Sequence, residues 1–518
     1  QMQGLDAAFV ALEQPNAPIH IGSIAIYDPS TAPGGFVRFK DILAFIEGRL
    51  RLAKSLRQRM VRTPFGIDYP YWIEDADFDL EYHVRHAALP KPGDWRQLCI
   101  LTARTFSRPL DLTRPPWELL VVEGLDKVAG APKGSYAILS KMHHAAIDGA
   151  SGVDLMHALH SLEPKPAPLP GRDTWKGEKM PGQLAMFARG SVRGFLNPLR
   201  QAQLAAKAVP GLAKVALGAV KGDFDFGATM STPRTRFNGK VSPHRVVDGR
   251  SFALADVKKM RALSDGATVN DVMLSIVGGA MRAYLEEHDE LPDETLAAMA
   301  PISVRSESER NTMGNQVSAM RAPLGTHIEG AADRVAFVAR ETQKSKAMTN
   351  AVGARQMAEI SKYAPALYMG LAARLYTQWG LANRLTPMFN TVVTNVPGPP
   401  MPIYSAGARL VNIFGNLCVL DGVALGHVVQ SYMDKITVTA TACRDAMPDP
   451  EFYAQCIQDS FEELRDAAAG TAASSPTPKT GTKVRRGTTS GLKRSTAKPT
   501  SSAAAKAKPK SPAQKSKR

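Results

Sequence analysis

The order of apolar and polar residues divides the chain into strand-like and helix-like stretches. Residues 135–142 (SYAILSKM) are a mostly apolar run of strand length and predict a largely buried strand. Residues 254–288 carry apolar side chains at helical spacing and predict successive helices. Residues 241–254 (VSPHRVVDGRSFAL) predict a strand with a turn at Asp248 and Gly249. Both halves of the chain therefore mix strands with helices, which favours the α/β class.

Breaks in this pattern suggest four regions. A proline-rich segment, EPKPAPLPG, ends a first domain over 1–175, and a second domain covers 236–465. The region between them, 176–235, predicts a basic amphipathic linker, with helical spacing broken at Pro198 and Pro210. Such a linker can lie on an anionic bilayer or pack against its own domain. The last region, 466–518, is a Lys/Arg-rich tail that we expect to be disordered.

Charge is concentrated in that tail. Residues 471–518 hold 13 Lys and Arg and no Asp or Glu, so the formal net charge of +16 falls to +3 without them. A basic tail can attract anionic lipid or nucleic acid. Because no folded nucleic-acid module accompanies it, nucleic acid is not an expected partner.

Composition fits a large enzyme. A chain of 518 residues with 44% hydrophobic content can bury ample core. It contains no run of about 18 apolar residues, so we expect no transmembrane helix, and its first residues do not resemble a secretory signal. Four scattered cysteines fit a reducing cytoplasm and predict no disulfide framework.

A histidine pair follows the strand predicted over 135–142. His143 and His144 open HHAAIDG, in which Asp148 and Gly149 begin a turn of small residues. A neutral imidazole can take a proton from a substrate hydroxyl, so the pair is a candidate catalytic base at the mouth of a strand-to-helix junction.

Spacing alone is weak evidence, because His-x-x-x-Asp-Gly recurs at His244, Asp248 and Gly249. That copy lies within a predicted strand, where a histidine is usually a surface or packing residue. A zinc site is the other interpretation of paired histidines. It is not favoured, since adjacent side chains diverge on a strand and no HExxH spacing occurs. A GxSxG elbow is also absent near any suitable strand, so no serine acyl-enzyme is predicted.

HHAAIDG resembles the HHxxxDG motif of the bacterial wax ester synthase/diacylglycerol acyltransferase family. That family belongs to the superfamily of chloramphenicol acetyltransferase and peptide-synthetase condensation domains. Further stretches are similar to the family, in its order, over roughly residues 4–465: GLDAAFVALEQPNAPIHIGSIAIYD, SRPLDLTRPPWELLVVEGL, ATVNDVMLSIVGGAMRAYL, PISVR, GNQVS and NVPGP. One departure is Pro115-Pro116-Trp117 in place of the usual Pro-Leu-Trp, and the second proline stiffens this loop and removes a backbone donor.

The resemblance implies two chloramphenicol-acetyltransferase-like α/β domains with a tunnel that reaches the active histidine from opposite faces. Within the motif, His144 matches the family's catalytic His-x-x-x-Asp spacing, and His143 is the neighbour that shapes the site. We expect Asp148 to fix the loop through hydrogen bonds or an Arg pair rather than to act in a triad, and Gly149 to supply the freedom that the turn needs.

The family's Asn-Asp pair corresponds to Asn270 and Asp271. The Asn270 amide can donate to a developing oxyanion, or it can belong to a helix cap within residues 268–271. Trp117 packs as core or as tunnel wall.

An acyl thioester is already activated, so one base acting on the acceptor alcohol suffices. We expect transfer of a long-chain acyl group from acyl-CoA to diacylglycerol, without a cofactor or metal. The alternatives are a fatty-alcohol acceptor, which would make a wax ester synthase, and a lipid-surface or nucleic-acid binding protein with a decayed site. The expected location is the cytoplasm, in peripheral contact with the inner face of the cell membrane or with lipid droplets, because the acceptor is insoluble in water.

Overall fold

The computed structural model describes residues 1–66, 68–146, 156, 158–169, 171, 173–192, 231–303, 317–352 and 386–474. Residues 1–474 form one compact unit. Its described residues form two six-stranded sheets and one hairpin, β2 (Gln58–Val61) with β3 (Tyr71–Glu74).

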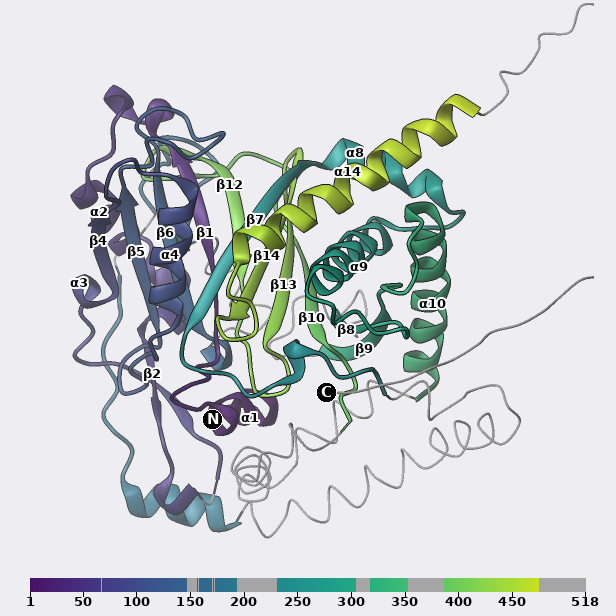
Figure 1. The fold of residues 1–518 in the computed structure, drawn as a ribbon. Coiled ribbons are helices and arrows are strands. Elements are labelled where there is room, and N and C mark those ends of the chain that lie inside the picture. The colour runs from purple at the N-terminus through teal and green to yellow at the C-terminus, as the bar shows by residue number, and fades with distance from the viewer. Residues whose placement is uncertain are drawn as a thin grey trace, which may run out of the picture. The chain divides into compact units, whose positions relative to one another are not determined.

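The first sheet combines strands from both ends of the chain. Its order is β11-β12-β1-β6-β5-β4, with every neighbouring pair antiparallel except β4 and β5. The strands are β1 (His20–Asp28), β4 (Val84–Ala88), β5 (Trp117–Glu123), β6 (Tyr136–His143), β11 (Tyr404–Ser405) and β12 (Ala408–Asn416). The last two come from the second half of the sequence and continue the sheet beyond β1 (Figure 1). The two sequence halves are thus not identical with the two sheets.

The second sheet has the order β7-β14-β13-β10-β8-β9. Its middle pairs, β13 with β10 and β10 with β8, are parallel, and the outer pairs are antiparallel. The strands are β7 (Arg245–Ala253), β8 (Ala297–Ser303), β9 (Val317–Pro323), β10 (Thr391–Pro397), β13 (Leu425–Tyr432) and β14 (Lys435–Cys443).

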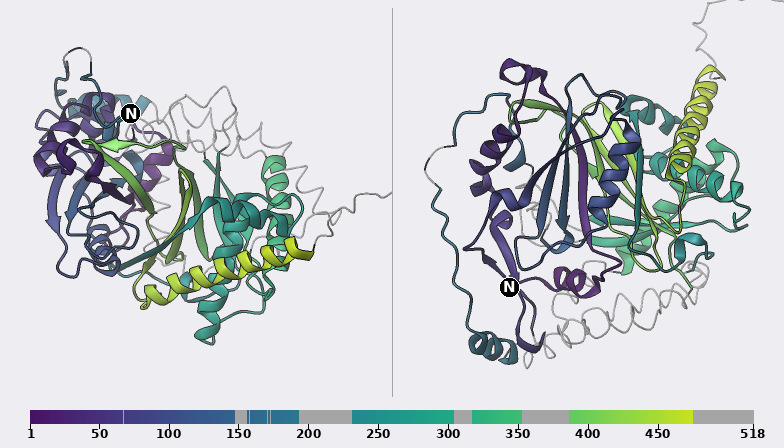
Figure 2. Two further views of the ribbon diagram at one scale, coloured as in Figure 1. Left: turned by 90° about the horizontal axis from the view of Figure 1, so that it is seen from above. Right: turned by 60° about the vertical axis from the view of Figure 1, so that its left-hand side comes forward.

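Helices cover these sheets. The first half has α1 (Gly4–Leu12), α2 (Phe39–Glu47), α3 (Leu80–His83), α4 (Trp95–Phe106) and a helix over residues 183–192; the second has α8 (Leu254–Met260), α9 (Val269–Glu287), α10 (Ala331–Val352) and α14 (Pro450–Ser474). In both views of Figure 2 the yellow helix α14 lies beside the teal and green elements of the second half, and it packs on α8, α9 and β7. A side chain at Gly278 of α9 would meet the Leu324 carbonyl oxygen at 2.1 Å, so glycine there permits the close approach of the chain after β9.

The two sheets meet along β12. Thr437 Oγ1 of β14 donates to the Ile413 carbonyl at 2.8 Å, and the Tyr432 hydroxyl of β13 donates to the Leu410 carbonyl at 3.2 Å. On the other side of the junction, Trp95 Nε1 of α4 donates to Asp248 Oδ1 of β7 at 2.8 Å. Strand β12 is therefore paired into the first sheet and packed on the second, so it joins the two sheets.

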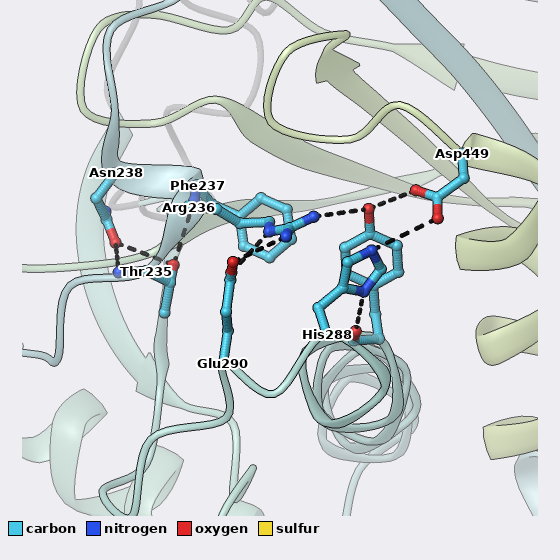
Figure 3. Close-up of polar contacts among 8 residues, drawn as sticks. Thr235, Arg236, Phe237, Asn238, His288, Glu290 and Asp449 are labelled. Atoms are coloured by element: carbon cyan, nitrogen blue, oxygen red, sulfur yellow. Dashed lines mark hydrogen bonds and ion pairs between the residues drawn. The ribbon is translucent and has the colours of Figure 1, made fainter. Parts of the chain in front are cut away.

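A polar network ties the start of the second half to its helices (Figure 3). The Arg236 guanidinium makes a bidentate pair with Glu290, at 2.7 and 2.8 Å. The Tyr284 hydroxyl of α9 donates to Asp449 Oδ1 at 2.5 Å, and His288 Nε2 lies 3.6 Å from Asp449 Oδ2. These contacts join α9 to the residue that precedes α14, so the network is structural.

The structure tests several sequence predictions. The strand predicted over 135–142 is β6, and the helical spacing of 254–288 corresponds to α8 and α9, so both are confirmed. The turn predicted at Asp248 and Gly249 is wrong, because both residues lie inside β7 and pair with β14. Helix α14 continues to Ser474, nine residues past the predicted bound of the second domain at residue 465. Most of the predicted linker, with Pro198 and Pro210, and the tail from residue 475 lie outside the described residues.

Candidate active site

The histidine pair lies at the carboxyl end of β6, between β1 and β5. This strand is almost wholly buried, as its apolar sequence predicts, and it ends at His143. His144 begins a 3-10 turn, His144–Ala146, and its backbone N–H donates to the Ile19 carbonyl at 3.0 Å. The histidine pair therefore stands where a central strand leaves the sheet.

Backbone contacts hold His143 in one orientation. Its N–H donates to the Pro116 carbonyl at 2.9 Å, and its ring Nδ1 accepts from the Ala145 N–H at 3.1 Å. An Nδ1 that accepts leaves the proton of the neutral ring on Nε2. Nε2 faces Glu13 Oε2 at 3.5 Å, and the residue is only 1% exposed. These contacts therefore hold the buried His143 ring in one orientation.

Glu13 also faces a third histidine. His20, which pairs with His143 across β1 and β6, lies with Nε2 3.8 Å from Glu13 Oε1. Its ring centroid is 6.4 Å from that of His143. Burial lowers the pKa of His20 well below 6.5, and the nearby charge of Lys141 lowers it further, so the ring is neutral. Glu13 Oε1 also accepts from the Ile19 N–H at 3.3 Å, which fixes the carboxylate beside both rings.

Lys141 is a buried cation two residues before His143. Its Nζ pairs with Glu118 and donates to the carbonyls of Thr105 and Arg108, each at 3.0 Å. Burial lowers its pKa, which the Glu118 carboxylate opposes. Sequence reasoning missed Glu13, His20 and Lys141. The signal available was that the first two belong to the family-like stretch near the N-terminus and the third to the strand that carries the motif.

His144 has a different environment. Its ring lies on Phe9 of α1, with centroids 4.1 Å apart, and its Nδ1 is buried. Desolvation lowers the pKa of His144 below 6.5, and the neighbouring His143 lowers it further, against a smaller contribution from its own backbone carbonyl. The imidazole is therefore neutral at neutral pH, the state that a general base requires.

The remaining motif residues, Asp148 and Gly149, fall outside the described residues.

Trp117 lies on the neighbouring strand β5. Trp117 is 3% exposed, its Nε1 donates to the Leu56 carbonyl at 2.7 Å, and its ring stacks on His83 at 4.5 Å. It pairs with Met142 across β5 and β6, so the indole is core packing beside the site. The departure Pro115-Pro116 supplies the carbonyl that accepts from His143.

Asn270 and Asp271 begin α9. Thr268 caps this helix, since its Oγ1 accepts from the Asp271 N–H at 3.3 Å while Asp271 Oδ2 accepts from the Thr268 N–H at 2.9 Å. Asp271 Oδ1 accepts from Thr342 Oγ1 at 2.7 Å, which ties α9 to α10. Asp271 is thus a capping residue. The half-buried Asn270 side chain makes no hydrogen bond to a described residue.

No group of three or more His, Cys, Asp or Glu side chains suited to a metal ion occurs in the part of the chain that the structure describes. None of the described helices has both the length and the apolar character needed to cross a membrane.

Comparison with protein families identifies the class. Residues 2–273 match the wax ester synthase/diacylglycerol acyltransferase catalytic domain, and residues 313–465 match the WS/DGAT C-terminal domain. The chain belongs to this family and is an acyltransferase of lipid biosynthesis.

Two relatives of this family match most of the chain. One putative diacylglycerol O-acyltransferase of Mycobacterium tuberculosis is 33% identical over 467 residues, covering 90% of this chain and 99% of the relative. A second from the same species is 30% identical over 470 residues, covering 90% of each.

Solved structures share the fold of two chloramphenicol-acetyltransferase-like domains, as predicted. The wax ester synthase/diacylglycerol acyltransferase from Marinobacter aquaeolei VT8 has a TM-score of 0.63 at 24% identity, covering 90% of this chain and 98% of that one. A starter condensation domain of rhizomide synthetase has a TM-score of 0.51 at 13% identity, covering 90% and 94%.

Proposed function

We propose that this acyltransferase moves a long-chain acyl group from acyl-CoA to diacylglycerol, giving triacylglycerol and free CoA, with His144 as general base. The observation that carries the proposal is the contrast within the pair: the His143 ring is 1% exposed and its Nδ1 already accepts from the Ala145 N–H, whereas His144 is less deeply buried and is kept neutral by desolvation. Relatives described as putative diacylglycerol O-acyltransferases support the acceptor.

The chemistry follows from one base. His144 Nε2 takes the proton of the acceptor hydroxyl as its oxygen attacks the thioester carbonyl. The tetrahedral intermediate collapses with cleavage of the C–S bond, and the imidazolium returns the proton to the CoA thiolate. Asn270, at the N-terminus of α9, is the candidate donor to the developing oxyanion. The scheme requires no cofactor.

Product analysis tests the proposal directly. Radiolabelled palmitoyl-CoA is offered with diacylglycerol, with hexadecanol and with no acceptor, and the products are separated by thin-layer chromatography. We expect labelled triacylglycerol in the first arm. Label only in wax ester would assign the fatty-alcohol reaction instead, and the absence of label from both esters would contradict acyl transfer to either acceptor.

Access to a water-insoluble acceptor requires a lipid surface, and we propose peripheral contact with the inner face of the cell membrane or with a lipid droplet. In the helix over 183–192, the Leu184 side chain is 82% exposed and Met186 packs on the β2–β3 hairpin. The loop that connects β2 to β3 contains Phe65, which is 89% exposed. Exposed apolar side chains beside basic residues are typical of interfacial segments.

Cosedimentation with phosphatidylglycerol vesicles at rising salt tests this contact. Replacing Leu184 and Phe65 by Asp should release the protein, and Met433→Asp, at another exposed apolar position, is the control. If binding is lost only when the chain is truncated after Ser474, the tail and not this surface is the anchor.

A further inference from the structure

A cationic pocket of about 570 Å³ lies between α4 and the start of β7. Its walls are the face and carboxyl end of α4, the first residues of β7 and the segment that follows β14. Its described lining includes no Asp or Glu and six basic residues: Arg96, Arg104, Arg108, His244, Arg245 and Arg444. Collecting the five arginine charges around one concavity costs free energy unless an anion compensates them.

Only part of this charge is neutralised within the described protein. Arg96 pairs with Glu451 at 2.7 Å. Three exposed arginines, Arg104, Arg108 and Arg444, make no ion pair with any described residue. These three guanidinium groups are therefore free to bind a ligand.

The Asp248 carboxylate does not pair with the three exposed arginines. Asp248, the closest acid along β7, is 2% exposed and accepts from Trp95 Nε1 and from Arg250 Nη1, at 2.8 and 3.1 Å. The Arg245 guanidinium donates to backbone carbonyls, including that of Asn16 at 2.7 Å, and so forms the floor of the pocket.

The pocket is next to the candidate active site. Lys141, two residues before His143 on β6, donates to the carbonyl of Arg108 in the pocket wall and to that of Thr105. Asn16, which receives the Arg245 guanidinium, is three residues beyond Glu13, whose carboxylate faces the His143 ring. Lys141 and the segment that holds Glu13 and Asn16 thus connect the lining of the pocket to the histidine pair.

We propose that this pocket holds the phosphate groups of the acyl-CoA donor, with Arg104, Arg108 and Arg444 as their ligands. The identity of the donor rests on the proposed function. Guanidinium groups match phosphate oxygens in geometry and charge, and the 3′-phosphate and diphosphate of CoA offer several such groups on one ligand. His244, the histidine of the second His-x-x-x-Asp-Gly copy, then lines a binding pocket and has no role as a base.

Two palmitoyl thioesters test the pocket, one of CoA and one of a short thiol that has neither the nucleotide nor the pantoate part of CoA. Arg104→Gln, Arg108→Gln and Arg444→Gln are assayed singly and together with palmitoyl-CoA and with S-palmitoyl-N-acetylcysteamine, which lacks phosphate. The quantity compared is kcat/KM for palmitoyl-CoA divided by kcat/KM for S-palmitoyl-N-acetylcysteamine. Each single replacement should lower this ratio about 5-fold and the triple replacement about 100-fold, because KM for palmitoyl-CoA rises. Arg340→Gln, at an exposed arginine of α10, is the control. An unchanged ratio in the triple variant would overturn the proposal.

Direct binding separates this inference from the proposed function. Calorimetric titration of the full chain with adenosine 3′,5′-bisphosphate should show binding to the wild type and a loss of about 100-fold in the triple variant. This result would support the pocket even if the wild type transferred no acyl group to diacylglycerol. Equal binding by both proteins would overturn it. Loss of phosphatidylglycerol vesicle binding without loss of nucleotide binding would assign the arginines to a lipid headgroup and also overturn it.

Discussion

Two buried histidine clusters in this chain differ in how fully their ring nitrogens are hydrogen-bonded. In the second sheet, His427 Nδ1 lies 3.0 Å from Thr391 Oγ1 and Nε2 lies 2.7 Å from the Tyr453 hydroxyl. In the first sheet, His20 makes no side-chain hydrogen bond to a described residue, and His143 Nε2 has only Glu13 at 3.5 Å. Buried polar groups are normally paired, so a cluster left incomplete requires a reason.

The reason differs between the two regions. Both ring nitrogens of His427 have a hydroxyl partner, and these contacts hold β10, β13 and α14 together. Around His144 the chain leaves ring nitrogens unpaired beside a carboxylate, at the point where β6 ends. Complete pairing stabilises a core, whereas incomplete pairing preserves groups that can exchange protons with a substrate. This comparison predicts opposite consequences for substitutions in the two clusters.

The largest effect is expected at His144. His144→Ala should lower kcat for palmitoyl-CoA and diacylglycerol by about 10²–10⁴-fold, because the acceptor hydroxyl loses its base. The melting temperature should stay close to that of the wild type, since the ring is only partly buried and lies at the end of β6. His143→Ala should be milder in rate. A purified His144→Ala protein with wild-type turnover would show that the base lies elsewhere.

Glu13 should come next, as a positioning residue. Glu13→Ala removes the carboxylate that faces His143 and His20 and should lower kcat about tenfold, the equivalent of one charge-assisted contact. Glu13→Gln keeps an acceptor for the Ile19 N–H and for the His143 ring and should recover most of that loss. If both variants lost activity equally, the negative charge, and not the orientation of the ring, would be the important property.

Part of this site could be predicted from the sequence. The apolar run that became β6 and the motif that follows it identified His143 and His144, because both signals are local. Glu13 and His20 could not be found this way, since they reach His143 only through the antiparallel pairing of β1 with β6. Long-range pairing also explains the turn wrongly predicted at Asp248-Gly249. There the neighbouring strand β14 and the Trp95 hydrogen bond outweigh the local turn preference.

At His427 the expected effect is on stability. His427→Leu leaves the Thr391 and Tyr453 hydroxyls without their ring partner in a fully buried site, which should cost about 1–3 kcal/mol. Thermal unfolding should show a melting temperature lower by several degrees, while kcat at low temperature stays unchanged. A loss of kcat without a loss of stability would reverse the comparison between the clusters.

Acid should destabilise the fold through the same residue. Burial lowers the pKa of His427 to about 3 from an ordinary value of 6.5, so between these values the unfolded chain binds a proton that the folded protein does not. Stability is therefore complete above pH 6.5 and decreases as the pH falls. His427→Leu removes this linkage, and its unfolding free energy should vary less steeply with pH in urea titrations. Identical slopes for both proteins would contradict a neutral, buried His427.

The smallest effect concerns the rate near neutral pH. Burial lowers the pKa of His144 below 6.5, so less of the ring is protonated at pH 6.5 than in an exposed histidine. The acid-side decline in a plot of kcat/KM against pH should therefore have its midpoint below 6.5. His143→Asn removes the neighbouring imidazole, whose electrostatic effect also lowers the pKa of His144, and should move the decline slightly upward in pH. A wild-type midpoint at or above 6.5 would mean that the titrating base is exposed, which is not the environment of His144.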